Sequence, residues 1–250
     1  MYSAFAQVYD ALMGAVPYQA WADHYGKLME SSGVPAGGRC VECACGTGSL
    51  TVPLQKKGYR MTGIDLSGEM LEIAMKKARS QGENIPFVKM DMCDLVLPRR
   101  ADCVLATCDG VNYLTAPARA KRFFAAAFEA LRPGGALIFD VSTPEKLKNA
   151  LGNNTLFSDE GEIAYIWRNR WAEKTQCVEM GLSVFVRRAD GAYDRLEEAQ
   201  IQRAHSRKEL KGWLQDAGFE RIAFYGRMRM TAPRSGDERW HVTAVKPGKA

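Results

Sequence analysis

Between residues 39 and 141 the sequence alternates short apolar runs with helical segments, and this alternation constrains the fold most. The expected strands are 39–45, 59–66, 85–91, 101–107 and 136–141, and the expected helices are 50–57, 69–79 and 116–131. Strands that are apolar throughout and alternate with helices are typical of a parallel sheet with helices on both faces. The pattern therefore predicts an α/β fold with a doubly wound, mostly parallel sheet.

The alternation stops after Ser142. Three consecutive β-rich runs follow at 163–171, 177–187 and 192–203, and Asp190-Gly191 predicts a hairpin turn between the last two. We interpret residues 143–205 as an antiparallel β insertion after the fifth strand, with the role of a substrate cap or a dimer surface.

The α/β pattern resumes at Ser206, which begins a capping box with Glu209. A helix at 206–217 and strands at 219–225 and 239–245 bring the expected sheet to seven strands. Two amphipathic helices, at 3–13 and 17–31, precede the core. The predicted division is an N-terminal helical segment 1–36, a core of 37–142 and 206–250, and the insertion 143–205.

A glycine turn, Glu42-Cys43-Ala44-Cys45-Gly46-Thr47-Gly48, follows the first expected strand. Doubly wound folds bind ligands at the carboxyl ends of their strands, and a helix N-terminus there favours an anionic group. Asp65 ends the second expected strand, where a carboxylate can accept hydrogen bonds from both hydroxyls of a ribose. Together these features predict a ligand that contains adenosine.

The turn departs from the dinucleotide fingerprint G-x-G-x-x-G. Counted from Gly46, the third glycine is replaced by Thr51, and counted from residue 44, the first is replaced by Ala44. Because the close approach of a pyrophosphate is poorly supported, a ligand with a carboxylate and no phosphate fits better.

The glycine turn resembles the first motif of class I S-adenosylmethionine-dependent methyltransferases, commonly D/E-x-G-x-G-x-G, with Ala44 at a glycine position. Three later segments are similar to the family's next motifs, in order: GIDLSGEML, VKMDMCDL and LRPGGALIFDV. The segment FAQVYDALMGAVPYQAW resembles a small bacterial subgroup that begins with a Tyr-Asp helix. The resemblance implies a Rossmann-like methyltransferase fold, S-adenosyl-L-methionine as cofactor and S-adenosyl-L-homocysteine as product.

The resemblance also implies which residues bind the cofactor. Glu42 and the turn are expected at the methionine moiety, Asp65 at the ribose and Asp91 at the adenine amino group. The full expected set is Tyr9, Glu42, Ala44, Cys45, Gly46, Gly48, Asp65, Leu66, Met70, Asp91, Met92, Cys108 and Asp109.

The acceptor side is less constrained, because a sulfonium methyl group is already activated and the protein mainly orients the reactants. A general base matters only where the nucleophile must lose a proton. His205 and Tyr18 are the catalytic candidates, with capping or packing as the alternative for His205. The candidate acceptor contacts are Trp21, Asn112, Tyr113, Tyr165, Trp167 and Arg170. His24 and His241 are expected to be structural.

Several function classes remain open. A small-molecule acceptor is favoured; an RNA or protein acceptor, a non-catalytic cofactor-binding protein and a nicotinamide-dependent enzyme are the alternatives. The net charge of +5 is mild and does not by itself indicate nucleic acid. The +5 arises from residues 203–250, which keeps an anionic acceptor in view. A homodimer is an open alternative to a monomer.

Cysteine usage and hydropathy suggest the compartment. Seven cysteines, an odd number, favour a reduced, cytoplasmic protein over a disulfide framework. No apolar run approaches the length of a transmembrane helix, and the first residues lack a signal-peptide pattern. Cys40-x-x-Cys43 has zinc-like spacing without a second pair, so no metal site is predicted.

Overall fold

The computed structural model describes residues 3–159 and 161–248, so the ends of the predicted segments 1–36 and 206–250 lie outside the described residues. Its larger sheet has seven strands in the order β10-β11-β5-β4-β1-β2-β3. The strands are β1 Arg39–Cys43, β2 Arg60–Asp65, β3 Phe87–Lys89, β4 Ala101–Ala106, β5 Leu131–Ser142, β10 Glu220–Gly226 and β11 Arg239–Val245. Strands β1 to β5 pair in parallel, whereas β11 is antiparallel to both β5 and β10. The predicted doubly wound, mostly parallel, seven-stranded sheet is confirmed.

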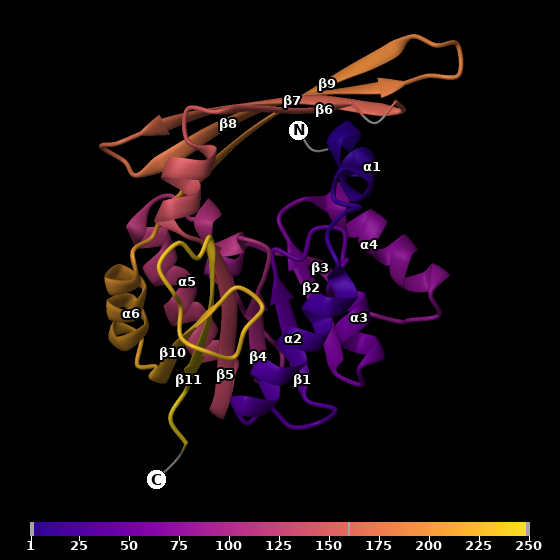
Figure 1. Ribbon diagram of the computed structural model, residues 1–250. Coiled ribbons are helices and arrows are strands. Elements are labelled where there is room, and N and C mark those ends of the chain that lie inside the picture. The colour runs from indigo at the N-terminus through magenta and orange to yellow at the C-terminus, as the bar shows by residue number, and fades with distance from the viewer. Residues whose placement is uncertain (1–2, 160, 249–250) are drawn as a thin grey trace.

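Helices cover both faces of this sheet (Figure 1). They are α2 Tyr18–Ser31, α3 Thr51–Lys56, α4 Gly68–Ser80, α5 Pro117–Ala130 and α6 Arg207–Asp216. Because side chains alternate along a strand, β4 sends Val104 to the cluster under α5 and α6, and Leu105 to the cluster under α2 and α3. Both side chains are fully buried, and each such burial contributes about 1.5–3 kcal/mol.

Side chains cap two helix starts. The Ser67 hydroxyl accepts the Met70 N–H at the start of α4. Ser206 and Glu209 form a complete capping box at α6, which confirms the predicted start of that helix. Short 3₁₀ helices, η1 Met92–Asp94 and η2 Gly110–Tyr113, follow β3 and β4 at the carboxyl edge of the sheet. These turns, together with the glycine turn, put the motif residues at one edge.

The insertion forms a second, antiparallel sheet with four strands in the order β6-β7-β8-β9, one more than predicted. They are β6 Thr155–Asp159, β7 Ile163–Ala172, β8 Cys177–Arg187 and β9 Tyr193–Arg203. Strand β6 was missed because it is a five-residue edge strand, TLFSD, with two large apolar side chains. It follows the π-helix η3 Glu145–Leu151, which was also not expected.

Helix α1, Ser3–Leu12, lies between the two sheets. Figure 1 shows the second sheet as a layer across the top of the molecule, with α1 below one end of it. Phe5 and Ala6 of α1 pack with Met70 of α4 and Val184 of β8. Helix α1 is therefore held between the carboxyl edge of the core and the insertion. None of the described helices has the length and apolarity needed to cross a membrane.

Candidate functional site

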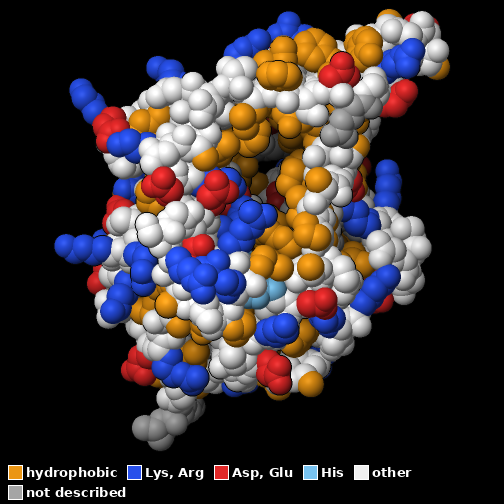
Figure 2. Space-filling model, viewed as in Figure 1, with side chains coloured by type: hydrophobic (Ala, Val, Ile, Leu, Met, Phe, Trp, Pro, Cys, Tyr) orange, Lys and Arg blue, Asp and Glu red, His pale blue; other side chains and the backbone are white. Residues whose placement is uncertain are grey.

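A cavity of about 290 Å³ lies at the carboxyl ends of β1, β2 and β4, and residues of α1 and β9 also line it. This volume is near the lower end of the range for small-molecule sites, about 300–1,000 Å³. Figure 2 shows a hollow between the upper layer and the core, with hydrophobic side chains gathered around it. Of the expected cofactor residues, those in its wall are Tyr9, Glu42, Ala44, Cys45, Gly46, Asp65, Leu66, Met70, Asp91, Met92 and Cys108.

The glycine turn needs backbone conformations that L-residues rarely adopt. Gly46 and Gly48 have φ of +54° and +71°, and Ala44 has φ of +53°. The Ala44 methyl group faces Gly110, where an added Cβ would lie 3.4 Å from it, in ordinary van der Waals contact. Gly48 lies outside the cavity wall, because it packs against α4 and β3: a Cβ there would be 3.1 Å from Ala74 Cβ. Residue 48 therefore needs to be small because of this close packing.

Asp65 is held by the glycine turn and by the start of α4. Its Oδ2 accepts the Gly46 N–H at 2.8 Å, and its Oδ1 accepts the Ser67 N–H at 2.9 Å. Each carboxylate oxygen can accept a further hydrogen bond, so Asp65 can still receive two hydroxyls from the cavity. Leu66 beside it is 60% exposed and lines the same cavity with Met70.

Asp91 has partners within the protein. It accepts the Cys93 N–H at 2.9 Å, capping η1, and a hydrogen bond from Arg119 Nη2 at 2.6 Å. Burial is the largest single influence and disfavours its charged form, but the hydrogen bonds from Arg119 and the Cys93 N–H and the positive charge of Arg119 together outweigh burial and lower the pKa of Asp91. Asp91 and Arg119 both line the cavity, so a ligand there meets a carboxylate and a guanidinium together.

Glu42 is the buried acid of the site. Its carboxylate accepts hydrogen bonds from the hydroxyls of Thr51 and Thr107, both at 2.5 Å. Burial nevertheless dominates and raises the pKa of Glu42 to about 7. A cation placed in the cavity would favour the charged carboxylate, because an opposite charge nearby lowers an acid's pKa.

Helix α1 is fastened to the glycine turn through Asp10, which sequence reasoning missed. Asp10 Oδ1 accepts hydrogen bonds from Thr47 Oγ1 at 2.6 Å and Ser49 Oγ at 3.2 Å. Lys77 Nζ of α4 lies 2.7 Å from Asp10 Oδ2. The only sequence signal was the position of Asp10 next to Tyr9, whose ring lines the cavity.

Cys108 and Asp109 form a turn with positive φ at both residues, 52° and 67°. Such conformations cost non-glycine residues on the order of 1–3 kcal/mol each. Cys108 lines the cavity as expected, but Asp109 lies outside its wall. The Asp109 carboxylate instead accepts hydrogen bonds from Arg239 at 2.6 and 3.0 Å and from Ser142 Oγ at 2.8 Å.

The catalytic candidates differ in their placement. Tyr18 lines the cavity, and burial raises its pKa well above the ordinary value. His205 is fully buried outside the cavity wall, with Nδ1 at 2.7 Å from Arg203 Nη1 and Nε2 at 3.1 Å from the Val111 carbonyl. Burial lowers the pKa of His205 to about 4. This placement does not support His205 as a base; it packs the insertion against η2.

One of the six acceptor candidates lines the cavity, and the other five do not. Tyr113 lines the cavity, and its hydroxyl donates to Gln200 Oε1 at 2.7 Å. Gln200 of β9 was not expected, because the alternation within a strand does not tell which residue meets another sheet's edge. The other candidates lie outside the cavity wall: Trp21, Asn112, Tyr165, Trp167 and Arg170.

Each of these five residues has a structural contact instead. Asn112 Nδ2 donates to the carbonyls of Ser142 and Arg203, at 3.1 and 2.9 Å, and so ties together both ends of the insertion. Arg170 pairs with Glu179. Trp21, Tyr165 and Trp167 pack in the hydrophobic clusters.

The remaining histidines and cysteines pack in the core. The His24 and His241 rings lie 4.5 Å apart between centroids, and both are buried. Cys40 belongs to the cluster under α2 and α3, and Cys43 to the cluster under α5 and α6. These two thiols lie on opposite faces of the sheet, so they cannot share a metal ion. Among residues 3–159 and 161–248, no cluster of three or more His, Cys, Asp or Glu side chains is arranged to hold a metal.

Comparisons with known proteins agree with the motifs. A family model described as a methyltransferase domain matches residues 40–135. A protein of Geobacillus sp. (strain WCH70), provisionally named a methyltransferase, is 35% identical over 245 residues, which cover 98% of this chain and 99% of the relative.

Solved structures share the fold. The S-adenosylmethionine-dependent methyltransferase from Clostridium acetobutylicum ATCC 824 is 30% identical, has a TM-score of 0.89 and matches 99% of both chains. The sugar N-methyltransferase KedS8 from Streptoalloteichus sp ATCC 53650 is 19% identical, with a TM-score of 0.76 over 96% of this chain and 93% of its own. At that identity the likeness concerns the fold alone.

Proposed function

Since the chain belongs to the class I S-adenosylmethionine-dependent methyltransferases, with S-adenosylmethionine as cofactor, we propose that it methylates a nitrogen or oxygen atom of a small molecule. The cavity at the carboxyl edge of the sheet carries this proposal, because cofactor motifs and aromatic side chains of other elements line it together. Its small volume and its position beside α1 and β9 favour a small acceptor over a macromolecule. The sugar N-methyltransferase KedS8, which shares the fold, is consistent with such an acceptor.

The cavity residues fit the chemical groups of this cofactor. We assign Asp65 to the ribose hydroxyls, because both of its oxygens are fixed by backbone N–H groups and remain able to accept. Leu66, Met70 and Met92 offer apolar surface for the adenine, and Asp91 lies near them. Glu42 and the glycine turn serve the methionine end, where the ammonium group complements a buried carboxylate.

Helix α1 closes the cofactor side of the cavity in this proposal. Tyr9 supplies the covering ring, and the contacts of Asp10 with Thr47 and Ser49 hold the helix in place. Because α1 packs on both α4 and the insertion, we assign the N-terminal helices as a cover and the second sheet as a cap over the acceptor.

Methyl transfer by this chain depends on orientation. The bound cofactor supplies a methyl group already activated by the sulfonium charge. Tyr18, Tyr113 and Gln200 form the wall that we assign to the acceptor. Tyrosine is protonated at neutral pH, and burial raises the pKa of Tyr18 further, so we assign Tyr18 as a hydrogen-bond donor and not as a base. We therefore infer that the acceptor reacts through its own lone pair, that enclosure excludes water during transfer, and that any proton on the methylated atom goes to solvent after product release.

Two measurements test the function. Calorimetric titration with S-adenosylhomocysteine and with NAD should show binding of the first alone. Incubation with trideuteromethyl-labelled cofactor and a bacterial metabolite extract should label a small molecule, read by mass spectrometry. Label found only in RNA or protein fractions would contradict the small-molecule acceptor and leave the cofactor assignment intact.

The compartment is a further part of the proposal. All seven cysteines are free thiols, six of them buried, which suits a reducing cytoplasm. We propose that the protein works there.

A further inference from the structure

A polar network lies beneath the Cys108–Asp109 turn, on the side away from the cavity. Asp140 of β5 is fully buried. It accepts the Cys108 N–H at 3.0 Å, the Asp109 N–H at 2.8 Å and the Tyr25 hydroxyl at 2.9 Å. Both N–H groups of the turn therefore donate to one carboxylate.

Arg239 of β11 joins this carboxylate to that of Asp109. Its Nη1 donates to Asp109 Oδ1 at 2.6 Å and to Asp140 Oδ1 at 2.7 Å, and its Nη2 donates to Asp109 Oδ2 at 3.0 Å. The guanidinium carbon also lies 5.0 Å from the centre of the Trp21 ring. The planar guanidinium group of Arg239 thus bridges two carboxylates that would otherwise repel each other in the core.

The network explains how the turn keeps an unfavourable conformation. Cys108 and Asp109 both have positive φ, which non-glycine residues avoid. Successive N–H groups in such a turn point to one side and form a concavity suited to an anion. The Asp140 carboxylate occupies that concavity, so a side chain of the protein itself takes the place of a bound anion.

The turn in turn shapes the cavity. Cys108 and Gly110 line the cavity, and Gly110 faces Ala44 of the glycine turn. A shift of this turn would move one wall toward or away from the methionine end of the proposed site. Asp140 and Arg239 lie outside the wall themselves.

We propose that Asp140 and Arg239 are positioning residues for the cofactor: they hold the Cys108–Asp109 turn in the conformation that shapes the cavity wall. Neither residue contacts the cofactor in this assignment. Cofactor affinity then depends on a network that spans β5, β11 and α2.

The test measures S-adenosylhomocysteine affinity by calorimetry in folded variants. Asp140→Asn replaces a carboxylate oxygen by an amide donor that faces the turn, and Arg239→Lys keeps the charge but removes the fork. Each should weaken binding by about tenfold or more.

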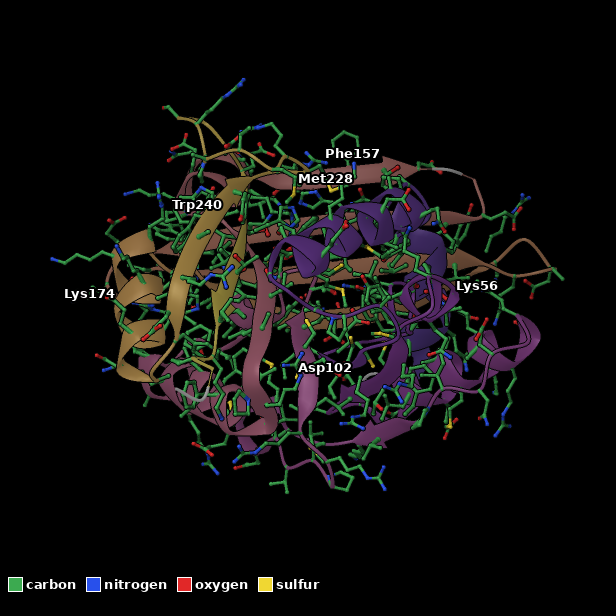
Figure 3. The ribbon with its side chains drawn as sticks, turned by 90° about the horizontal axis from the view of Figure 1, so that it is seen from below. Lys56, Asp102, Phe157, Lys174, Met228 and Trp240 are labelled. Carbon is green, nitrogen blue, oxygen red and sulfur yellow. The ribbon has the colours of Figure 1, made fainter. Side chains whose placement is uncertain are left out.

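Asp102→Asn is the matched control. Asp102 lies at the amino end of β4 (Figure 3), accepts the Arg39 N–H at 2.7 Å and pairs with Arg132. The Asp102→Asn variant loses a comparable ion pair at the end of β4 opposite the Cys108–Asp109 turn. It should therefore have lower thermal stability and unchanged cofactor affinity.

A rescue separates positioning from general stability. Glycine adopts positive φ without steric cost, so Cys108→Gly added to Asp140→Asn should recover a measurable part of the lost affinity. If Asp140→Asn does not fold, Arg239→Lys with and without Cys108→Gly provides the same comparison. Wild-type affinity in the folded variants, an equal loss in Asp102→Asn, or no recovery with glycine would each overturn the proposal.

Discussion

The hydroxyl of Thr47, in the glycine turn, donates a 2.6 Å hydrogen bond to the carboxylate of Asp10, in the first helix, across 37 residues of sequence. The same carboxylate lies 2.7 Å from Lys77 Nζ of α4. One side chain of α1 therefore contacts both the glycine turn and α4, the helix that follows Asp65. The position of α1 depends on this contact.

Replacing Asp10 should loosen α1. Asp10→Ala removes two hydrogen bonds and an ion pair, and hydrogen bonds to charged groups contribute about 1.5–3 kcal/mol when buried, less when partly exposed. S-adenosylhomocysteine should dissociate about 5–10-fold faster in stopped-flow measurements. Asp23→Ala, which removes the surface ion pair of α2 with Lys57, is the control and should dissociate as the wild type does. An unchanged rate in Asp10→Ala would show that α1 does not retain the cofactor.

Replacing Asp65 should abolish cofactor binding while the protein stays folded. Asp65→Ala loses the proposed acceptor for both ribose hydroxyls, which corresponds to at least about 3 kcal/mol, or more than 100-fold in Kd. Calorimetry measures the affinity, and circular dichroism checks the fold. Asp94→Ala, at a surface pair with Arg122, serves as the control. Wild-type affinity in Asp65→Ala would mean that the ribose lies elsewhere.

Cofactor binding should release protons near neutral pH. The pKa of Glu42 is raised to about 7 by burial, and a bound ammonium group would lower it, so affinity for S-adenosylhomocysteine should increase as pH rises through 7. Calorimetry at pH 6.5 in buffers of different ionisation enthalpy measures the proton release. Glu42→Gln should release none. Equal proton release by the wild type and this variant would exclude Glu42 as the source.

Glu42 should also make folding stability depend on pH, but in the opposite direction: its contribution to stability decreases as pH rises, whereas cofactor affinity increases. An acid whose folded pKa is above its unfolded pKa binds more protons when folded, so its unfavourable contribution is fully present above pH 7 and disappears as pH falls toward the unfolded value near 4.5. Urea unfolding should show Glu42→Gln gaining stability over the wild type at pH 8, by up to about 3 kcal/mol, and less at pH 5. A difference independent of pH would contradict the raised pKa.

Gln200 should act on the acceptor and not on the cofactor. Once a labelled acceptor is identified, Gln200→Leu should raise its KM by about 5–10-fold, because the hydrogen bond with Tyr113 and the proposed polar contact with the acceptor are lost. The Kd for S-adenosylhomocysteine should stay unchanged. Glu197→Gln, on an exposed position of the same strand, is the control. A change in cofactor affinity alone would move Gln200 out of the acceptor wall.

The core and its motifs were predictable because their signals are local. Apolar runs alternating with helices fix the parallel sheet, and Ser67 and Ser206 cap helices three residues from their partners. The glycine turn and Asp65 also lie in consecutive strand–turn–helix units, so sheet topology alone brings them to one edge. The sequence determined the fold class and the strand ends at which the cofactor motifs lie.

Other parts of the site depended on contacts between distant segments. Asp109 looked like a cavity residue, but Arg239, 130 positions later, draws its carboxylate to the other side. Gln200 lines the cavity, Asp10 contacts the glycine turn and His205 lies outside the cavity wall, because the second sheet and α1 pack against the core in three dimensions. Local periodicity reports which face of an element is apolar, whereas the partner of a polar side chain depends on packing between elements; only the tertiary structure decided those partners.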